Sequence, residues 1–276
     1  MNDQDTLSFS VLITHFGDSF WVKNAIRSLN LTKSEFKIFV LDNQGDFPEI
    51  EGLHVIPTYS MVDGQDSQHH AYALDWALNN LDFITDYILI LDSDVMGLGN
   101  ADLSFTLKRI LKSFGAIVAL REGSRFLSHP CFLLFPSNLS KEINISEGMR
   151  EFGFDTGTLI GLQLARKGLS ILRVSAEKSP KSPVGYLYKD IDCFHLTSSS
   201  LSYTSRRFKP DSVIWKIKVG SREKIAQKIV EGTNVTRLTF FALILKTSFN
   251  IFFWLLRQKT NEFVKLMSPS HSRGNM

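Results

Sequence analysis

Three mostly apolar runs of strand length limit the folds open to this chain. They span Phe9 to Thr14, Phe36 to Leu41 and Tyr87 to Leu91. Strands with a solvated face alternate apolar and polar residues, so nearly continuous apolar runs indicate strands buried on both faces of a sheet. Between them, the stretches Asp18 to Leu29 and Gln68 to Leu81 carry apolar residues at helical spacing. We therefore predict an α/β fold, with a mostly parallel sheet covered by helices on both faces.

Further elements follow with less regular spacing. We expect strands at His54–Pro57, Ala116–Leu120, Cys131–Phe135 and Ile171–Val174, helices at Ser104–Phe114 and Thr156–Lys167, and a short apolar segment at Ile191–Leu196. Residues 175–190 are rich in Ser, Pro, Lys and Gly, which predicts a loop. The composition becomes basic after residue 200, so we place the end of the main domain near residue 210 and expect a helical C-terminal extension over 211–276.

Composition excludes several classes of protein. The 276 residues include 31 basic and 28 acidic side chains, a net charge of +3. Nucleic-acid binding is not expected, because it requires a basic patch or stripe. Two cysteines make no disulfide framework, which favours a reducing, cytoplasmic location. The polar start, Met1 to Ser8, is unlike an ordinary signal peptide.

The run that ends at Leu91 continues as Asp92-Ser93-Asp94. Residues i and i+2 of a strand face the same side, so the two carboxylates can converge at the strand end. Carboxylate oxygens, together with the phosphates of a substrate, are the usual ligands of Mg²⁺ and Mn²⁺. The segment therefore predicts phosphate–metal chemistry at the edge of the sheet.

Polar residues also follow the first two strands, as Thr14-His15 and Asp42-Asn43. Ligands bind a doubly wound sheet at the carboxyl ends of its strands, where all these residues are expected. The chain contains no Gly-x-Gly-x-x-Gly and no Gly-x-x-x-x-Gly-Lys-Ser/Thr motif, which argues against a dinucleotide oxidoreductase or a P-loop NTPase. A diphosphate bound here would need a metal ion to offset its charge.

The order of these motifs resembles the nucleotide-binding half of a family 2 glycosyltransferase with the GT-A fold, a Rossmann-like α/β fold. The matching segments are Phe9-Ser-Val-Leu-Ile-Thr14, Val40-Leu-Asp-Asn43, the helix from His69, and Ile90-Leu-Asp-Ser-Asp94. Phe154-Asp-Thr-Gly157 and Phe194-His-Leu196 also recur in bacterial members. The resemblance covers roughly residues 8–200.

The resemblance implies a metal-dependent enzyme that moves a sugar, as a hexosyltransferase does, from a nucleoside-diphosphate donor to a hydroxyl of a surface-glycan or lipid-linked acceptor. Asp94 would ligate Mn²⁺ or Mg²⁺, His195 would complete the metal shell, and Asp155 would be the general base of an inverting displacement. The implied donor-binding residues are Thr14, Asp42, Asn43, Asp92 and Ser93. The chain departs from the family because Asp155 stands alone where an acidic pair is usual.

Simpler roles exist for each of these side chains. Asp42, Asp92 and Asp94 suit turns, and Asp155 suits a helix N-cap. His195 lies between Phe194 and Leu196, as a core histidine would. His69 and His70 fit a solvated helix start better than a ligand pocket.

Three other functions fit parts of the pattern. A haloacid-dehalogenase-type phosphatase would use Asp92 as its nucleophile, but Met96 and the late position of the strand fit it poorly. A GT-A-like nucleotidyltransferase would carry a Gly-rich basic loop in place of His15-Phe16-Gly17. A catalytically silent glycan-binding or scaffold protein is the third alternative.

The C-terminal segment from Leu238 to Leu256 is strongly apolar, and its length approaches that of a membrane span. Thr239, Lys246, Asn250 and Arg257 fall on one narrow stripe of a helix wheel. A wide apolar face with a narrow basic stripe predicts a helix lying in a membrane interface, at the inner face of the membrane. The alternative is that this face packs on the main domain or on a second subunit.

Overall fold

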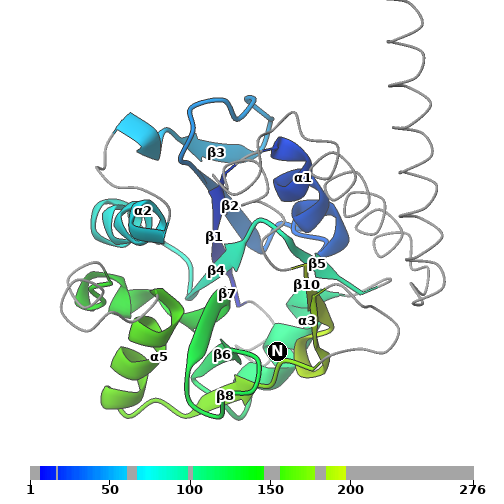
Figure 1. Cartoon of the computed structure of the whole chain (residues 1–276), viewed down its shortest axis with the longest axis vertical. Helices are drawn as coiled ribbons and strands as arrows, with labels where there is room; N and C mark the ends of the chain where they lie inside the picture. Colours follow the sequence, from blue (N-terminus) through cyan, green and yellow to red (C-terminus); the bar gives the residue numbers. More distant parts are fainter. Residues whose placement is uncertain are drawn as a thin grey trace, which may run out of the picture.

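The computed structural model describes residues 7–16, 18–60, 67–98, 102–145, 156–177 and 185–196, and its centre is a seven-stranded sheet (Figure 1). The strands of this sheet are β1 (Phe9–His15), β2 (Phe36–Asp42), β3 (Leu53–Ile56), β4 (Tyr87–Asp92), β6 (Ala116–Leu120), β7 (Ser128–Pro136) and β8 (Ile171–Val174). They lie in the order β3-β2-β1-β4-β7-β6-β8. The predicted strands are all present, with ends shifted by a few residues at most.

One strand runs against the others. Strands β1, β2, β3 and β4 pair in parallel, and so do β6 and β8, whereas β7 is antiparallel to both β4 and β6. The start of β7 therefore lies at the edge of the sheet where the parallel strands end. The predicted mostly parallel α/β sheet is confirmed, and this reversal was not anticipated.

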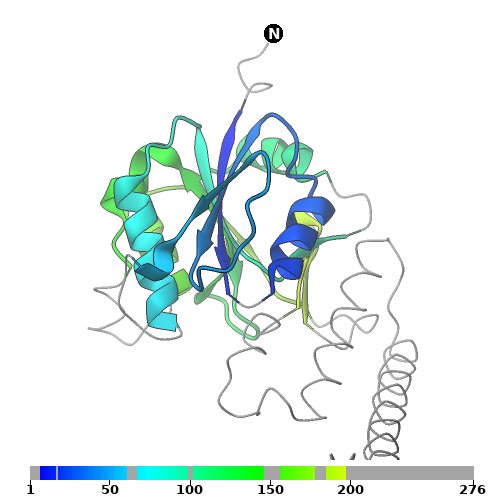
Figure 2. The ribbon, with the colours of Figure 1, turned by 90° about the horizontal axis from the view of Figure 1, so that it is seen from above.

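Helices cover both faces of the sheet, as Figure 2 shows with the sheet seen from above. The helices of the described residues are α1 (Ser19–Ser28), α2 (Ser67–Asn80), α3 (Leu103–Leu111) and α5 (Thr156–Arg166), with 3-10 turns η2 (Thr58–Ser60), η3 (Ser137–Glu142) and η4 (Lys189–Ile191). Helices α1 and α3 share one core cluster with the sheet, and α2 and α5 share the other.

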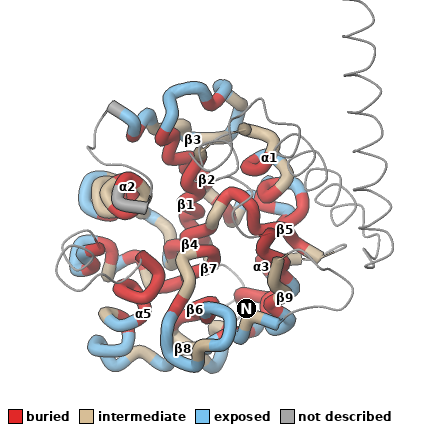
Figure 3. Tube along the Cα trace, viewed as in Figure 1, coloured by how far each residue is buried: buried red, intermediate tan, exposed pale blue. Residues whose placement is uncertain are grey.

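The core is continuous through the central strands, which Figure 3 shows as buried over almost their whole length. In β1, every residue from Phe9 to His15 is buried. Trp21 of α1 is fully buried as well. Exposure is concentrated on the outer helix faces, on the segment between β2 and β3, and on the loop between β6 and β7.

Local signals account for the helix ends. The Asp18 side chain accepts a hydrogen bond from the Phe20 amide at 2.8 Å and so caps α1, and Asp102 caps α3 in the same way. Gly168, with a φ of +74°, follows the end of α5 as predicted. Helix α5 also approaches β7 closely, because a Cβ atom on Gly157 would lie 2.3 Å from the Pro130 nitrogen.

A second, three-stranded sheet corrects the prediction for residues 175–190. It consists of β5 (Val95–Gly97), β10 (Cys193–His195) and β9 (Tyr186–Tyr188), all paired antiparallel. Part of the predicted loop is thus a strand, followed directly by η4, and Glu177 bridges to Leu187. Short strands of three residues carry too little periodicity to be recognised in a sequence.

The C-terminal extension, residues 211–276, and its apolar segment 238–256 lie outside the described residues. The predicted domain boundary near residue 210 also lies outside them and stays a prediction. Among the described residues, no helix has the length and apolar character that crossing a membrane requires.

Candidate active site

The candidate site lies where β1, β2 and β4 end. The register of the sheet places Thr14 of β1 beside Asp92 of β4, and His15 of β1 beside Asp42 of β2. The polar residues predicted to meet at the carboxyl edge of the sheet are therefore neighbours, as expected for a doubly wound fold.

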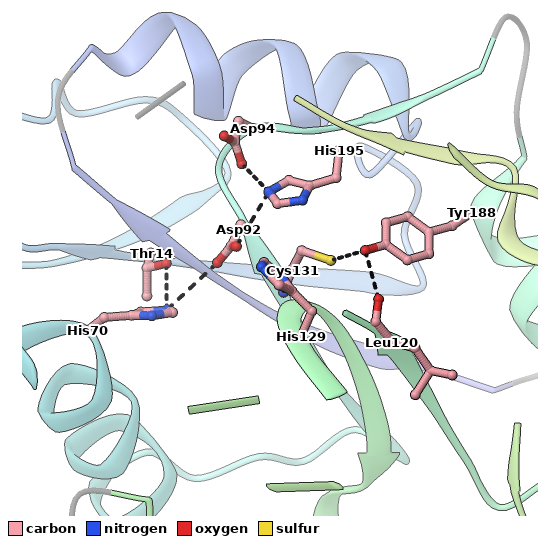
Figure 4. Close-up of polar contacts among 9 residues, drawn as sticks. All are labelled: Thr14, His70, Asp92, Asp94, Leu120, His129, Cys131, Tyr188 and His195. Atoms are coloured by element: carbon pink, nitrogen blue, oxygen red, sulfur yellow. Dashed lines mark hydrogen bonds and ion pairs between the residues drawn. The ribbon is translucent and has the colours of Figure 1, made fainter. Parts of the chain in front are cut away.

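Two carboxylates and one imidazole converge at this edge (Figure 4). The Nε2 atom of His195 lies 3.0 Å from Oδ1 of Asp94 and 3.7 Å from Oδ2 of Asp92. One donor atom from each of the three residues falls within 4.8 Å of the other two. The sequence therefore identified three side chains that the fold does bring together.

The turn after β4, rather than the pleat of a strand, brings the two carboxylates together. Asp92 is the last residue of β4, and Asp94 lies in the turn that leads to β5. The amide of Leu196 donates to the carbonyl oxygen of Asp94 at 3.2 Å. The residue that follows β10 thus holds the turn, in which the Ser93 side chain is also buried.

Burial makes the charges of this group costly unless they are paired. The Asp94 side chain is 2% exposed and that of His195 is 4% exposed, whereas Asp92 is 19% exposed. Burial is the largest single effect and opposes protonation of His195, but Asp94 and Cys131 together outweigh it, so the pKa of His195 is raised well above its ordinary value. Two neighbouring carboxylates need such a positive partner, which is either the imidazolium or a cation.

The donor set fits a hard divalent cation. Mg²⁺ holds oxygen ligands at about 2.1 Å, so two ligands of one ion lie at most about 4.2 Å apart. The group found here, within 4.8 Å, needs shifts of only a few tenths of an ångström to reach that arrangement. Carboxylates suit Mg²⁺ and Mn²⁺, and an imidazole nitrogen favours Mn²⁺ of the two.

His70 extends the site on the side of β1. Its Nε2 atom lies 3.1 Å from Oγ1 of Thr14 and 3.9 Å from Oδ1 of Asp92. His70 belongs to α2, which begins at Ser67, three residues earlier. The sequence favoured a solvated role for this histidine, whereas the structure places it against the predicted donor-binding residues.

The side chains of Asp42 and Asn43 already accept hydrogen bonds from nearby residues of the protein. The Asp42 carboxylate accepts hydrogen bonds from the amides of Gln44, Gly45 and Phe47, at 3.1, 2.9 and 3.1 Å. The Asn43 side chain accepts from the hydroxyl of Thr58 at 2.5 Å. Both residues shape the loop after β2, and contact between them and a nucleoside stays a prediction.

A second cluster at the same edge was missed by the sequence analysis. His129 and Cys131 lie at the start of β7, and their ligand atoms fall within 4.8 Å of those of His195. The Cys131 thiol donates to the Tyr188 hydroxyl at 3.5 Å, which in turn donates to the Leu120 carbonyl at 3.3 Å. Burial raises the pKa values of Cys131 and Tyr188, so both groups are neutral at pH 7.

A third group of possible metal ligands lies at the end of β2. His15 is buried, and its Nε2 atom lies 3.2 Å from Oδ1 of the exposed Asp46. Asp42 completes this group, but its carboxylate oxygens already accept the three amides of its loop. The Asp92–Asp94–His195 group is therefore the better candidate for a divalent cation.

The proposed general base, Asp155, lies outside the described residues. The helix that follows it, α5, begins at Thr156 and packs on the start of β7. The hydroxyl of Thr158 donates to the Ser128 carbonyl at 3.1 Å, which fixes this contact. The first turn of α5 is thus beside His129, at the same edge of the sheet as the carboxylates.

Comparisons with known proteins gave matches among solved structures alone. No protein-family model matches the chain, and no curated protein sequence matches it. The chain is similar in structure to the galactosyltransferase LgtC in complex with donor and acceptor sugar analogues (12% identity, TM-score 0.42), over 60% of this chain and 73% of that one.

Two other solved structures show a similar degree of likeness. The catalytic domain of the Drosophila β1,4-galactosyltransferase 7 in complex with xylobiose matches at 14% identity and a TM-score of 0.40, over 60% of this chain and 65% of that one. The glycosyltransferase GlyE of Streptococcus pneumoniae matches at 15% identity and a TM-score of 0.38, over 61% of this chain and 45% of that one.

Proposed function

We propose that this chain is a metal-dependent glycosyltransferase of the GT-A type that uses a nucleoside-diphosphate sugar as donor. The observation that carries the proposal is the convergence of Asp92, Asp94 and His195 on one point at the carboxyl edge of the sheet. The order of sequence motifs that resembles family 2 glycosyltransferases supports it as well.

The carboxylates and His195 would hold Mn²⁺ or Mg²⁺. Such an ion would supply a positive charge that stabilises the diphosphate as it leaves the sugar. His195 must release its proton before it can ligate a metal, because only the neutral imidazole has a free lone pair. Since Asp94 raises the pKa of His195, cation affinity should increase as the pH rises.

Transfer would form one bond and break another. The acceptor hydroxyl attacks the anomeric carbon, its proton passes to Asp155, and the bond from that carbon to the diphosphate oxygen breaks. A positioned carboxylate base contributes roughly 10²–10⁴-fold to such a step. A single displacement of this kind inverts the anomeric configuration, and a hexose is the sugar we expect.

Other residues of the edge would bind the donor. Thr14 and Ser93 line the ends of β1 and β4, and His70 contacts both Thr14 and Asp92. Asp42 and Asn43 would act through the loop that they hold. The acceptor would be a surface glycan or a lipid-linked glycan, reached by a cytoplasmic enzyme that contacts the inner membrane face through residues 238–256.

Nucleotide-dependent stabilisation tests the proposal. Thermal unfolding of the full chain should be followed with UDP-, GDP- and dTDP-sugars, each with and without Mn²⁺. A ligand that binds only the native state at 100 times its Kd stabilises it by about 2.7 kcal/mol. We expect one nucleotide class to raise the Tm in the presence of Mn²⁺, and Asp94→Asn to lose that rise.

Two results would contradict the proposal. The first is that no nucleotide stabilises the wild type, or that Asp94→Asn is stabilised equally. The second is phosphate release from simple phosphomonoesters that Asp92→Asn abolishes, which would identify the phosphatase alternative instead.

A further inference from the structure

His195 belongs to two groups of potential metal ligands, and the second contains a thiol. His129, Cys131 and His195 each offer one donor atom within 4.8 Å of the other two. The rings of His129 and His195 lie 4.9 Å apart at a tilt of 53°. We propose that these three residues form a binding site for Zn²⁺, which shares His195 with the neighbouring carboxylate site for Mn²⁺ or Mg²⁺.

The chemistry of the donors selects the metal. Two imidazole nitrogens and one thiolate are ligands for Zn²⁺, and they are poor ligands for Mg²⁺. Binding replaces the hydrogen of the Cys131 thiol by a sulfur–zinc bond and the proton on the ligating nitrogen of His195 by a nitrogen–zinc bond, and both protons are released to solvent. Three protein ligands leave one position of a tetrahedral zinc ion open.

Two features around the cluster favour metal binding, whereas Nδ1 of His129 already accepts a hydrogen bond from the Cys131 amide at 3.1 Å, which zinc binding to His129 would have to break. Cys131 is fully buried, and the Nδ1 atom of His195 is buried without a hydrogen-bond partner. A buried ring nitrogen left in this state is unfavourable, and a metal ion bound there in place of the ring proton would satisfy it. Tyr188 accepts from the thiol and donates to the Leu120 carbonyl, so once the thiol proton is lost its hydroxyl would have to turn from Leu120 to donate to the sulfur, and such hydrogen bonds orient ligands in metal sites.

The antiparallel direction of β7 explains why the cluster exists. His129 and Cys131 are two residues apart in one strand, so their side chains leave the same face. Because Phe132 pairs with Leu91, the start of β7 lies beside the end of β4, where Asp92 is. Figure 4 shows His129 and Cys131 beside His195, next to the two carboxylates.

Sharing His195 couples the two sites. The Nε2 atom of His195 faces Asp94, at 3.0 Å. Zn²⁺ that draws His195 toward Cys131 removes a ligand from the carboxylate pair and adds a like charge nearby. Zn²⁺ should therefore weaken the binding of Mn²⁺, and by reciprocity Mn²⁺ should weaken the binding of Zn²⁺. This consequence rests on the proposed function, whereas zinc binding itself does not.

Cobalt replacement tests the site on the metal-free full chain. Titration with Co²⁺ should produce the near-ultraviolet charge-transfer band of a thiolate–cobalt bond, and Zn²⁺ should abolish it. Cys131→Ser should lose the band and bind Zn²⁺ at least about tenfold more weakly. Even the loss of a residue that hydrogen-bonds to a metal ligand typically weakens metal binding about 10–100-fold. Cys193→Ser is the matched control, because Cys193 is equally buried and lies outside the cluster.

Two further variants keep the test decisive. His129→Gln removes a ligand at a half-buried position and should weaken Zn²⁺ binding even if Cys131→Ser does not fold. Asp94→Asn should lose Mn²⁺ binding and retain the cobalt band. Absence of the band in the folded wild type, or its persistence in Cys131→Ser, would overturn the zinc site. Absence of Mn²⁺ binding in the wild type, with the cobalt band present, would count against the proposed function and not against the zinc site.

Discussion

The Nε2 atom of His195 lies 3.0 Å from Oδ1 of Asp94, although β7 and α5 lie between these residues in the chain. The contact depends on the small sheet, in which His195 of β10 pairs with Val95 of β5, the residue after Asp94. The histidine that contacts the predicted carboxylate at the end of β4 therefore comes from the second, three-stranded sheet. Changes in that sheet should be detectable at the proposed cation site.

Gly185 offers a way to disturb this sheet from outside the ligand set. Its φ is +97°, and a Cβ atom there would lie 2.1 Å from the His195 carbonyl oxygen. Gly185→Ala should lower the free energy of unfolding by at least about 1–3 kcal/mol, the cost of a strained backbone, and weaken Mn²⁺ binding. Urea unfolding and Mn²⁺ titration measure the two effects.

Gly123→Ala is the control, because Gly123 also has a positive φ, +71°, but a Cβ atom there meets nothing within 4 Å. It should lose some stability and bind Mn²⁺ normally. If Gly185→Ala binds Mn²⁺ as well as Gly123→Ala does, the loop before β9 does not position His195.

His70 should matter for binding more than for stability. Its imidazole lies between Thr14 and Asp92, and its side chain is 19% exposed. His70→Ala should weaken Mn²⁺-dependent nucleotide binding roughly 10–100-fold, as loss of groups that orient metal ligands does. His54→Ala on β3 is the matched histidine control and should bind normally. Equal affinities for the two variants would exclude His70 from the site.

Glu35 gives the protein an acid-sensitive contact at the opposite end of the strands from the proposed cation site. The Ser104 hydroxyl donates to Glu35 at 2.7 Å, which lowers the pKa of this carboxyl, with smaller help from Lys108 and Lys33. A lowered folded pKa adds stability above the unfolded value of about 4.3, and that stability is lost as the pH falls through the folded pKa.

Ser104→Ala should therefore lower the free energy of unfolding by about 1 kcal/mol at pH 7, because it removes a hydrogen bond to a partly exposed carboxylate. This loss should become progressively smaller below pH ~4.3. Urea unfolding across the range from neutral to acidic pH measures the difference from wild type. Ser113→Ala, at an exposed serine after α3, should show no such dependence. A constant difference at all pH values would mean that Glu35 is not the group responsible.

The C-terminal segment should bind anionic vesicles through its basic stripe. Reversing two charges, with Lys246→Glu and Arg257→Glu in the full chain, should reduce flotation with phosphatidylserine vesicles, because each basic residue near the surface contributes about 1 kcal/mol. Lys112→Glu with Lys141→Glu makes the same charge change at exposed positions of the main domain. Equal flotation of the two double variants would reject the interfacial helix.

Signals that are local in the chain made much of this fold predictable. The apolar run before Asp92 gives β4 directly, and Gly168 marks the end of α5. His195 was recognised through a resemblance, since three residues of β10 carry no periodicity of their own. His129 and Cys131 were missed because their place depends on the antiparallel direction of β7, which pairing with β4 determines and sequence spacing does not.

Release of nucleoside diphosphate from a nucleotide sugar tests the central claim most directly. With the donor class found by thermal unfolding, the full chain should release the diphosphate when Mn²⁺ is present, and chelation of Mn²⁺ should stop the release. Asp94→Asn should lose at least about 10²-fold in rate, the effect of removing one electrostatic contact to a leaving group. Release that is unchanged by chelation and by Asp94→Asn would contradict the account.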